Sequence, residues 1–205
     1  MRRRARRSER GSILVEFALI FPILMFLALG VFEIGLMWRT SLTLANSVRS
    51  GARVGASVTS GPLADHAALA AVGSSIASIN KSGAGRATIT YVEIYKANAS
   101  NLPPAVCNAA SSCNSYTSAQ VAAIIANQAG TQSNFGSASS CVGKWDANWC
   151  PKDRSIDLSS ANGPDYLGVA IQIVYTPVTP IFFSSTRTMS DQAVMRLEPV
   201  ANLGS

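Results

Sequence analysis

Residues 12–39 read SILVEFALIFPILMFLALGVFEIGLMWR, and they constrain the architecture of the chain more than any other stretch. From Ile13 to Trp38 the run is uncharged except at Glu16 and Glu33. A bilayer core of about 30 Å needs about 20 helical residues, so this run can span it with some tilt or overhang. It is too long, and lacks an A-x-A exit, for a cleaved secretory signal. We therefore expect one transmembrane helix over residues 12–39.

The charge of the chain is concentrated ahead of this helix. Residues 1–11 contain six arginines and one glutamate, whereas the other 194 residues carry eleven Lys/Arg and ten Asp/Glu, a net charge of +1. Arginines at the start of a transmembrane helix favour a cytoplasmic N-terminus, which predicts an extracytoplasmic domain beyond about residue 40. A nucleic-acid partner requires a basic patch on a folded face, so the neutral body argues against one.

Three residues inside the apolar run need an explanation. Pro22 removes one backbone hydrogen bond and predicts a kink or local melting, although membrane helices tolerate proline and a packing role is the other interpretation. Glu16 lies one turn inside the run, where an ionised carboxylate is costly unless it reaches the headgroups or a partner. Glu33 lies near the opposite interface, and we expect it to be solvated there.

The spacing around Gly11 suggests processing. A basic leader ends at Gly11, the apolar helix begins at Ser12, and Glu16, followed by Phe17, is the fifth residue after the glycine. This pattern resembles a type IV prepilin site, which a membrane aspartyl peptidase cuts after the glycine. Cleavage would free a positive amine on Ser12, and the Glu16 carboxylate of one subunit would pair with the amine of its neighbour. Ser12 is smaller than the first residue usual in pilins, which puts N-methylation in doubt.

A longer stretch, from Arg10 to Ala56, resembles the TadE-like segment of Flp (Tad) pilus assembly proteins. QAVMRLEP, at residues 192–199, also resembles the way TadE/TadF-type proteins end. The resemblance implies a minor pilin or pseudopilin in the bacterial inner membrane, whose partners are the prepilin peptidase, other Flp/Tad pilins and the Tad assembly platform. The matching positions are Gly11, Glu16, Phe17, Pro22, Gly30, Glu33, Arg49, Gly51, Ala52 and Arg53.

The remaining pattern predicts an α+β ectodomain. Residues 40–60 continue as an amphipathic helix with small residues at helical spacing, which allow close packing against this protein's own ectodomain or against another helix. Residues 61–205 then form the extracytoplasmic domain, with an insertion at 98–165. Alternation and apolar periodicity predict a small antiparallel sheet with helices around it. The expected helices are 61–79 and 118–128, and the expected strands are 86–97, 166–178 and 188–197.

The insertion holds all four cysteines: Cys107, Cys113, Cys141 and Cys150. An even count in an oxidising compartment predicts two disulfides, for which three connectivities are open. Short loops close easily, which favours Cys107–Cys113 and Cys141–Cys150. A zinc site is the alternative, but the spacings are too long for one and the single histidine, His66, is distant. We expect no metal and no cofactor.

The second cysteine loop, CVGKWDANWC, contains Trp145 and Trp149. Exposed tryptophans on such a loop would contact a surface, a sugar or another pilin. Alternatively, the two rings cap a thin core and shield the disulfide. Both interpretations fit the sequence.

Catalysis is not expected, because no nucleophile–base pair, carboxylate dyad or phosphate-binding loop can be singled out. His66 is expected on the polar face of its helix. The function that the resemblance implies is assembly of a Flp/Tad pilus, at the tip or in a priming complex because the head is bulky. Two alternatives are an uncleaved bitopic scaffold of the assembly machinery and a membrane-tethered binding module.

Overall fold

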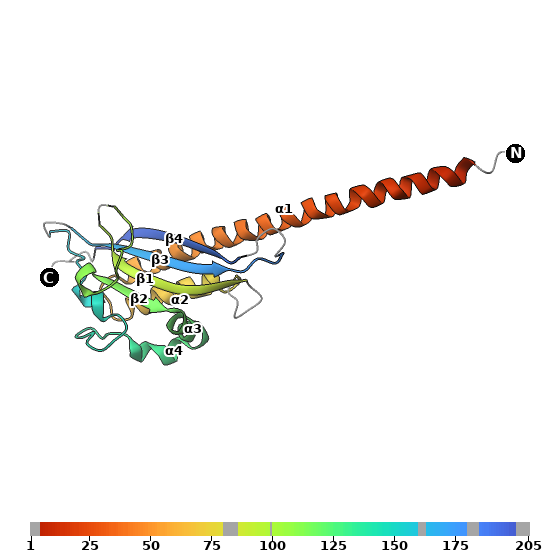
Figure 1. Cartoon of the computed structure of the whole chain (residues 1–205). Coiled ribbons are helices and arrows are strands. Elements are labelled where there is room, and N and C mark those ends of the chain that lie inside the picture. The colour runs from red at the N-terminus through yellow and green to blue at the C-terminus, as the bar shows by residue number, and fades with distance from the viewer. Residues whose placement is uncertain (1–4, 80–85, 99, 160–162, 180–184, 200–205) are drawn as a thin grey trace.

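The computed structural model describes residues 5–79, 86–98, 100–159, 163–179 and 185–199. The first four residues of the predicted leader lie outside the described residues. The dominant element is α1, a helix of 54 residues from Ala5 to Val58. Figure 1 shows that its N-terminal half projects alone from a mixed α/β head, while its C-terminal half runs along that head.

The helix α1 continues through Pro22 without a break. Local melting at this residue, one of the two expectations, is therefore wrong. The missing N–H of a proline removes one hydrogen bond from the helix, and the bonds of the neighbouring turns still hold the backbone in shape.

The head contains a four-stranded sheet in the order β2-β1-β3-β4, with every neighbouring pair antiparallel. This arrangement confirms the predicted α+β class with a small antiparallel sheet. The principal elements of the head are α2 (Ala64–Ile76), β1 (Ala87–Lys96), β2 (Cys113–Thr117), α3 (Ser118–Ala126), α4 (Gln128–Thr131), β3 (Tyr166–Tyr175) and β4 (Arg187–Arg196).

Strand β2 was not predicted from the sequence. It reads CNSYT, with little of the apolar alternation that marks a strand, and it forms because it pairs with β1 from Tyr91↔Thr117 to Tyr95↔Cys113. The side chain of Thr117 then accepts a hydrogen bond from the Gln120 backbone N–H and caps α3, which starts at the next residue.

The core lies between one face of the sheet and the helices that cover it. The C-terminal half of α1 packs against β3, β4 and α2, while α3 packs against α2 and β1. Gly51 lets α1 approach α2 closely, because a Cβ at this position would lie 2.4 Å from a methyl carbon of Val72 in α2. The small residues of α1 thus serve packing within this protein's own head. The core side chains include Leu44, Val48, Ala52, Leu69, Val72, Ile76, Val92, Ile94, Val169 and Ile171.

Candidate functional site

The projecting half of α1 carries apolar side chains on every side. All side chains from residue 11 to residue 28 are exposed, among them Leu14 at 69% and Leu19 at 70%. Within the described residues, α1 is the one helix that is long and apolar enough to cross a membrane. An apolar surface of this extent requires lipid or other apolar helices around it.

The predicted processing residues lie on this projecting half, far from the head (Figure 1). Gly11, Ser12, Glu16 and Phe17 are all exposed, and a Cβ at Gly11 would meet nothing within 4 Å. The ring of Phe17 packs against that of Phe21 with their centroids 5.3 Å apart. The segment is therefore open to a second protein, and within the described residues Glu16 makes no hydrogen bond or ion pair.

Glu33 differs from what the sequence led us to expect. Its side chain is completely buried, at 0% exposure, so the expectation of a solvated carboxylate is wrong. The Tyr175 hydroxyl donates to its Oε1 at 2.9 Å, and the backbone N–H groups of Val178 and Thr179 donate to its Oε2 at 3.0 Å each. The Thr179 hydroxyl adds a further bond at 2.9 Å. The segment that follows β3 thus wraps around this carboxylate.

These bonds fix α1 to the head at the level where the helix leaves it. Burial, followed by the hydrogen bond to Glu33, raises the pKa of Tyr175 to about 12, so the hydroxyl remains a donor at all physiological pH values. Hydrogen bonds to a carboxylate are stronger than those between neutral groups. We call Glu33, Tyr175, Val178 and Thr179 the junction clasp.

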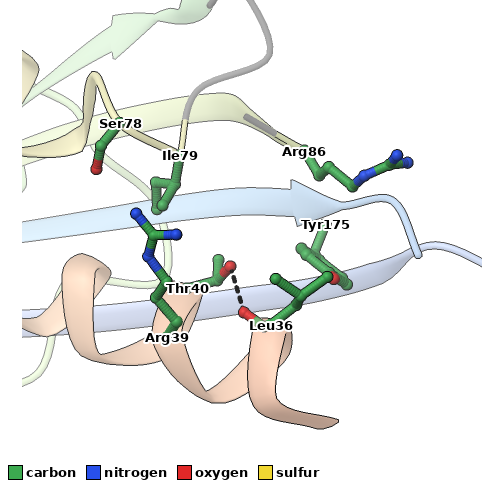
Figure 2. Close-up of a pocket in the computed structure, with 7 residues that line it drawn as sticks. All are labelled: Leu36, Arg39, Thr40, Ser78, Ile79, Arg86 and Tyr175. Atoms are coloured by element: carbon green, nitrogen blue, oxygen red, sulfur yellow. Dashed lines mark hydrogen bonds between the residues drawn. The ribbon is translucent and has the colours of Figure 1, made fainter. Parts of the chain in front are cut away.

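A pocket of about 130 Å³ opens beside the junction clasp (Figure 2). Arg39 reaches from α1 toward Ile79, while Arg86, at the start of β1, and Tyr175 lie on the opposite side. Both arginines are exposed. The described residues that line it are Leu36, Arg39, Thr40, Ser78, Ile79, Arg86 and Tyr175. The described lining therefore combines apolar side chains with two arginines.

A second polar cluster is buried inside the head. Asp65 of α2 accepts hydrogen bonds from Asn114 at 2.7 Å and from the Tyr116 hydroxyl at 2.6 Å, and it forms an ion pair with Arg154 in which both side chains have 0% exposure. Asn114 also exchanges two hydrogen bonds with the backbone of Trp149. This cluster attaches the insertion, through Asn114, Tyr116 and Arg154, to α2.

The tryptophans of the cysteine loop face inward. Trp149 is 5% exposed, with the Arg154 guanidinium 4.2 Å from its ring centroid. Trp145 is partly buried and makes an edge contact with Phe135 at 5.5 Å between ring centroids. The surface-contact interpretation is therefore wrong for Trp149, whose ring packs in the core, and the capping alternative describes it. His66 is also buried, at 5% exposure, instead of lying on a polar face.

The two disulfides are Cys107–Cys113 and Cys141–Cys150, which confirms the favoured connectivity. The first joins the segment after β1 to the start of β2. The second closes the loop that contains both tryptophans. Together with the Asp65 cluster, they hold the insertion in place on the head.

The family positions in the C-terminal half of α1 separate by face. Gly51 and Ala52 are buried against the head, whereas Arg49 and Arg53 are exposed. Gly30, nearer the junction clasp, is partly buried. The small residues therefore pack inside the molecule, and the two arginines remain available to a neighbour.

Comparison with known families identifies one segment of the chain. Residues 11–53 match the model of the TadE-like protein family. The chain carries a TadE-like segment. The match begins at the predicted processing glycine and includes Glu16 and Glu33, and it confirms the resemblance drawn from the sequence. Beyond residue 53 the head lies outside the match. No curated protein and no solved structure matches the chain.

Sequence reasoning missed the partners of Glu33 and the whole Asp65 cluster. One signal was present, because Asp65 and His66 are polar residues inside the otherwise small and apolar helix ADHAALAAVGSSI. A carboxylate in such a helix requires a buried partner. Nothing local pointed to Arg154, which lies 89 residues away in the chain.

Proposed function

We propose that this protein is a minor pilin or pseudopilin that takes part in assembly of a Flp/Tad-type pilus. The observation that carries the proposal is the change along α1 within the TadE-like segment. One half is an exposed apolar rod, and the other half is built into a folded head. A subunit of this shape can be held in a membrane by its rod and can pack that rod with others in a filament.

In this proposal the chain is anchored in the inner membrane with its N-terminus in the cytoplasm and its head outside. The arginines of the leader favour that orientation. The two disulfides suit an oxidising compartment, which supports a head outside the cytoplasm.

The prepilin peptidase would cut between Gly11 and Ser12, both of which are exposed. The new amine on Ser12 and the exposed Glu16 carboxylate would then pair between neighbouring subunits of the filament. Removal of the leader also removes most of the positive charge that holds the N-terminus at the cytoplasmic surface. The rod could then leave the membrane with the growing filament.

The head and its insertion favour a place at the tip or in a priming complex over one in the repeating shaft. The proposed role is structural, with the pilins and the Tad assembly platform as partners. Burial of Trp149 weakens the support for a tethered binding module, for which the partly buried Trp145 is the remaining tryptophan of the loop.

The test is the mature N-terminus, measured by intact mass and peptide sequencing on protein from native membranes with and without the prepilin peptidase. We expect a peptidase-dependent start at Ser12. A chain that begins at Met1 or Arg2 in both strains would contradict the processing and would favour the uncleaved scaffold.

Glu16→Ala tests assembly separately. It should reduce pilus number while the head stays folded. Unchanged piliation would remove the charge-pairing step, and uniform labelling of isolated pili by an antibody against the head would rule out the tip position.

A further inference from the structure

The pocket beside the junction clasp has no role in the function proposed above. It lies where α1 passes from an exposed apolar surface into the head. Phe32, Ile34 and Trp38 are 56%, 60% and 68% exposed on these turns. Tryptophan concentrates at the boundary between hydrocarbon and headgroups. Leu36 and Thr40 lie within two residues of Trp38, about 3 Å along the helix axis, so the pocket opens at headgroup depth.

The charge of the pocket is positive. Arg39 and Arg86 line it, and none of its seven lining residues is a carboxylate. The nearest acid on α1, Glu33, points its two oxygens at donors from Tyr175, Val178 and Thr179. The carboxylate is thus already engaged on the head side of the helix. Two of the lining residues are thus arginines, and guanidinium groups are the side chains best suited to phosphate oxygens.

The rest of the lining suits the part of a lipid next to its phosphate. Leu36 and Ile79 provide apolar side chains from two sides of the pocket, and Ser78 and Thr40 carry hydroxyls. The Thr40 hydroxyl already donates to the Leu36 carbonyl at 2.9 Å (Figure 2), so its lone pairs can accept from a hydroxyl of the headgroup, whereas the phosphate oxygens need the donors of the arginines and Ser78. Arg39 lines the pocket from α1, and Arg86 lines it from the residue before β1. Figure 2 shows the Arg86 guanidinium turned away from the other lining residues, so this exposed side chain would swing inward for a headgroup to contact both arginines.

We propose that this pocket binds the phosphate headgroup of an anionic phospholipid from the leaflet next to the head. Such a lipid would join α1 to the start of β1 and set the height of the head above the bilayer. The inference goes beyond pilus assembly, and it holds whether or not the leader is cleaved.

The experiment uses the full chain in lipid nanodiscs, followed by native mass spectrometry of the released protein. Phosphatidylglycerol is the anionic probe, and phosphatidylcholine with the same acyl chains is the zwitterionic comparison. We expect preferential retention of phosphatidylglycerol. Each of Arg39→Gln and Arg86→Gln should lower that preference about fivefold, the usual contribution of one basic side chain at a membrane surface. The double variant should abolish it.

Arg187→Gln is the matched control. Arg187 pairs with Tyr175 in the sheet and so lies at the same height, but it does not line the pocket. The control variant should retain phosphatidylglycerol like the wild type. An equal loss in all three single variants would overturn the pocket in favour of a diffuse positive surface.

Two further outcomes would also overturn the proposal. Equal retention of the two lipids by the wild type would show no anionic preference. Displacement of phosphatidylglycerol by inorganic phosphate at millimolar concentration would show a site for a free anion. Unfolding curves of the variants, followed by tryptophan fluorescence, should coincide with that of the wild type, because both arginine side chains are exposed.

Discussion

The two halves of α1 have the same helical backbone but different surroundings. In the projecting half every side chain from residue 11 to residue 28 is exposed, and most are large and apolar. In the half that follows Glu33, small residues such as Gly51 and Ala52 are buried against the head. The projecting half needs lipid or other apolar helices around it, whereas the half that follows Glu33 is already packed against the head. The change occurs at the junction clasp.

The two glutamates of α1 show the same difference. Glu16 is exposed within an apolar surface, and a carboxylate in that setting needs a partner from outside the chain. Glu33 is buried, and hydrogen-bond donors of its own chain surround it. Glu16 is therefore suited to contacts between subunits, and Glu33 is suited to the folding of its own chain. Variants that affect one half and spare the other test this distinction.

The largest expected effect concerns the head alone. Asp65→Ala leaves the Arg154 guanidinium charged and buried without its acid partner, which typically costs about 3–5 kcal/mol. The free energy of unfolding, measured with urea in detergent and followed by tryptophan fluorescence, should fall by this amount.

Asp153→Ala is the control for Asp65→Ala. Its ion pair with Lys152 is exposed, so its loss should change stability by less than about 1 kcal/mol. Similar losses in the two variants would contradict the importance of the buried cluster.

The next effect concerns the junction clasp. Glu33→Ala leaves the Tyr175 hydroxyl and the Val178 and Thr179 N–H groups without their acceptor, which should cost about 2–4 kcal/mol. Hydrogen exchange of the Val178 and Thr179 amides should accelerate strongly, whereas amides in the centre of β1 should change less. Glu16→Ala should alter neither, since its side chain is remote from the head. An unchanged exchange rate at Val178 in Glu33→Ala would contradict the clasp.

Much of the fold could be predicted from the sequence, because its signals are local. Strands β1, β3 and β4 alternate or carry long apolar runs, and their predicted ranges overlap the observed ones. The cysteine pairs lie 6 and 9 residues apart, so the closure of short loops identified them. The TadE-like resemblance rested on a contiguous segment for the same reason.

The interior of the candidate site could not be predicted in this way. Glu33 and Tyr175 are 142 residues apart, and Asp65 and Arg154 are 89 apart. Periodicity reports which face of an element is apolar, but it does not identify the residue that will pack there from a distant part of the chain. The apolar neighbours of Glu33 in the helix predict a carboxylate near the membrane surface. They give no sign of the loop that covers it.

Two glycines give a smaller effect that distinguishes the halves directly. A Cβ at Gly51 would lie 2.4 Å from a methyl carbon of the stiff side chain of Val72, whereas at Gly35 it would meet nothing within 4 Å. Gly51→Ala should destabilise the head by about 1–3 kcal/mol. Gly35→Ala should be neutral or stabilising by up to about 1 kcal/mol, because alanine favours the helix. Both are measured by urea unfolding, and equal effects would contradict the close packing of α1 on α2.

The smallest effect is a pH dependence of the head. His66 is the single histidine of the chain, and its Nε2 lies 3.0 Å from the Gln128 carbonyl oxygen. Burial lowers its pKa below the ordinary value of 6.5, although the bond to Gln128 acts in the other direction. Because the folded state holds the neutral ring more tightly than the unfolded state does, its contribution is complete above pH 6.5 and is lost as the pH falls below it.

The pH dependence is best measured as a difference between the wild type and His66→Gln. Burial raises the pKa values of Asp146 and Glu93, whose protonation favours the folded state as the pH falls and so opposes the effect of His66. Both proteins share these carboxylates, so subtraction of their unfolding free energies at pH 7.5, 6.5 and 5.5 isolates the imidazole. The stability advantage of the wild type should shrink as the pH falls. A constant difference would mean that His66 contributes through packing against Phe135, whose ring centroid lies 5.1 Å away, and not through its charge.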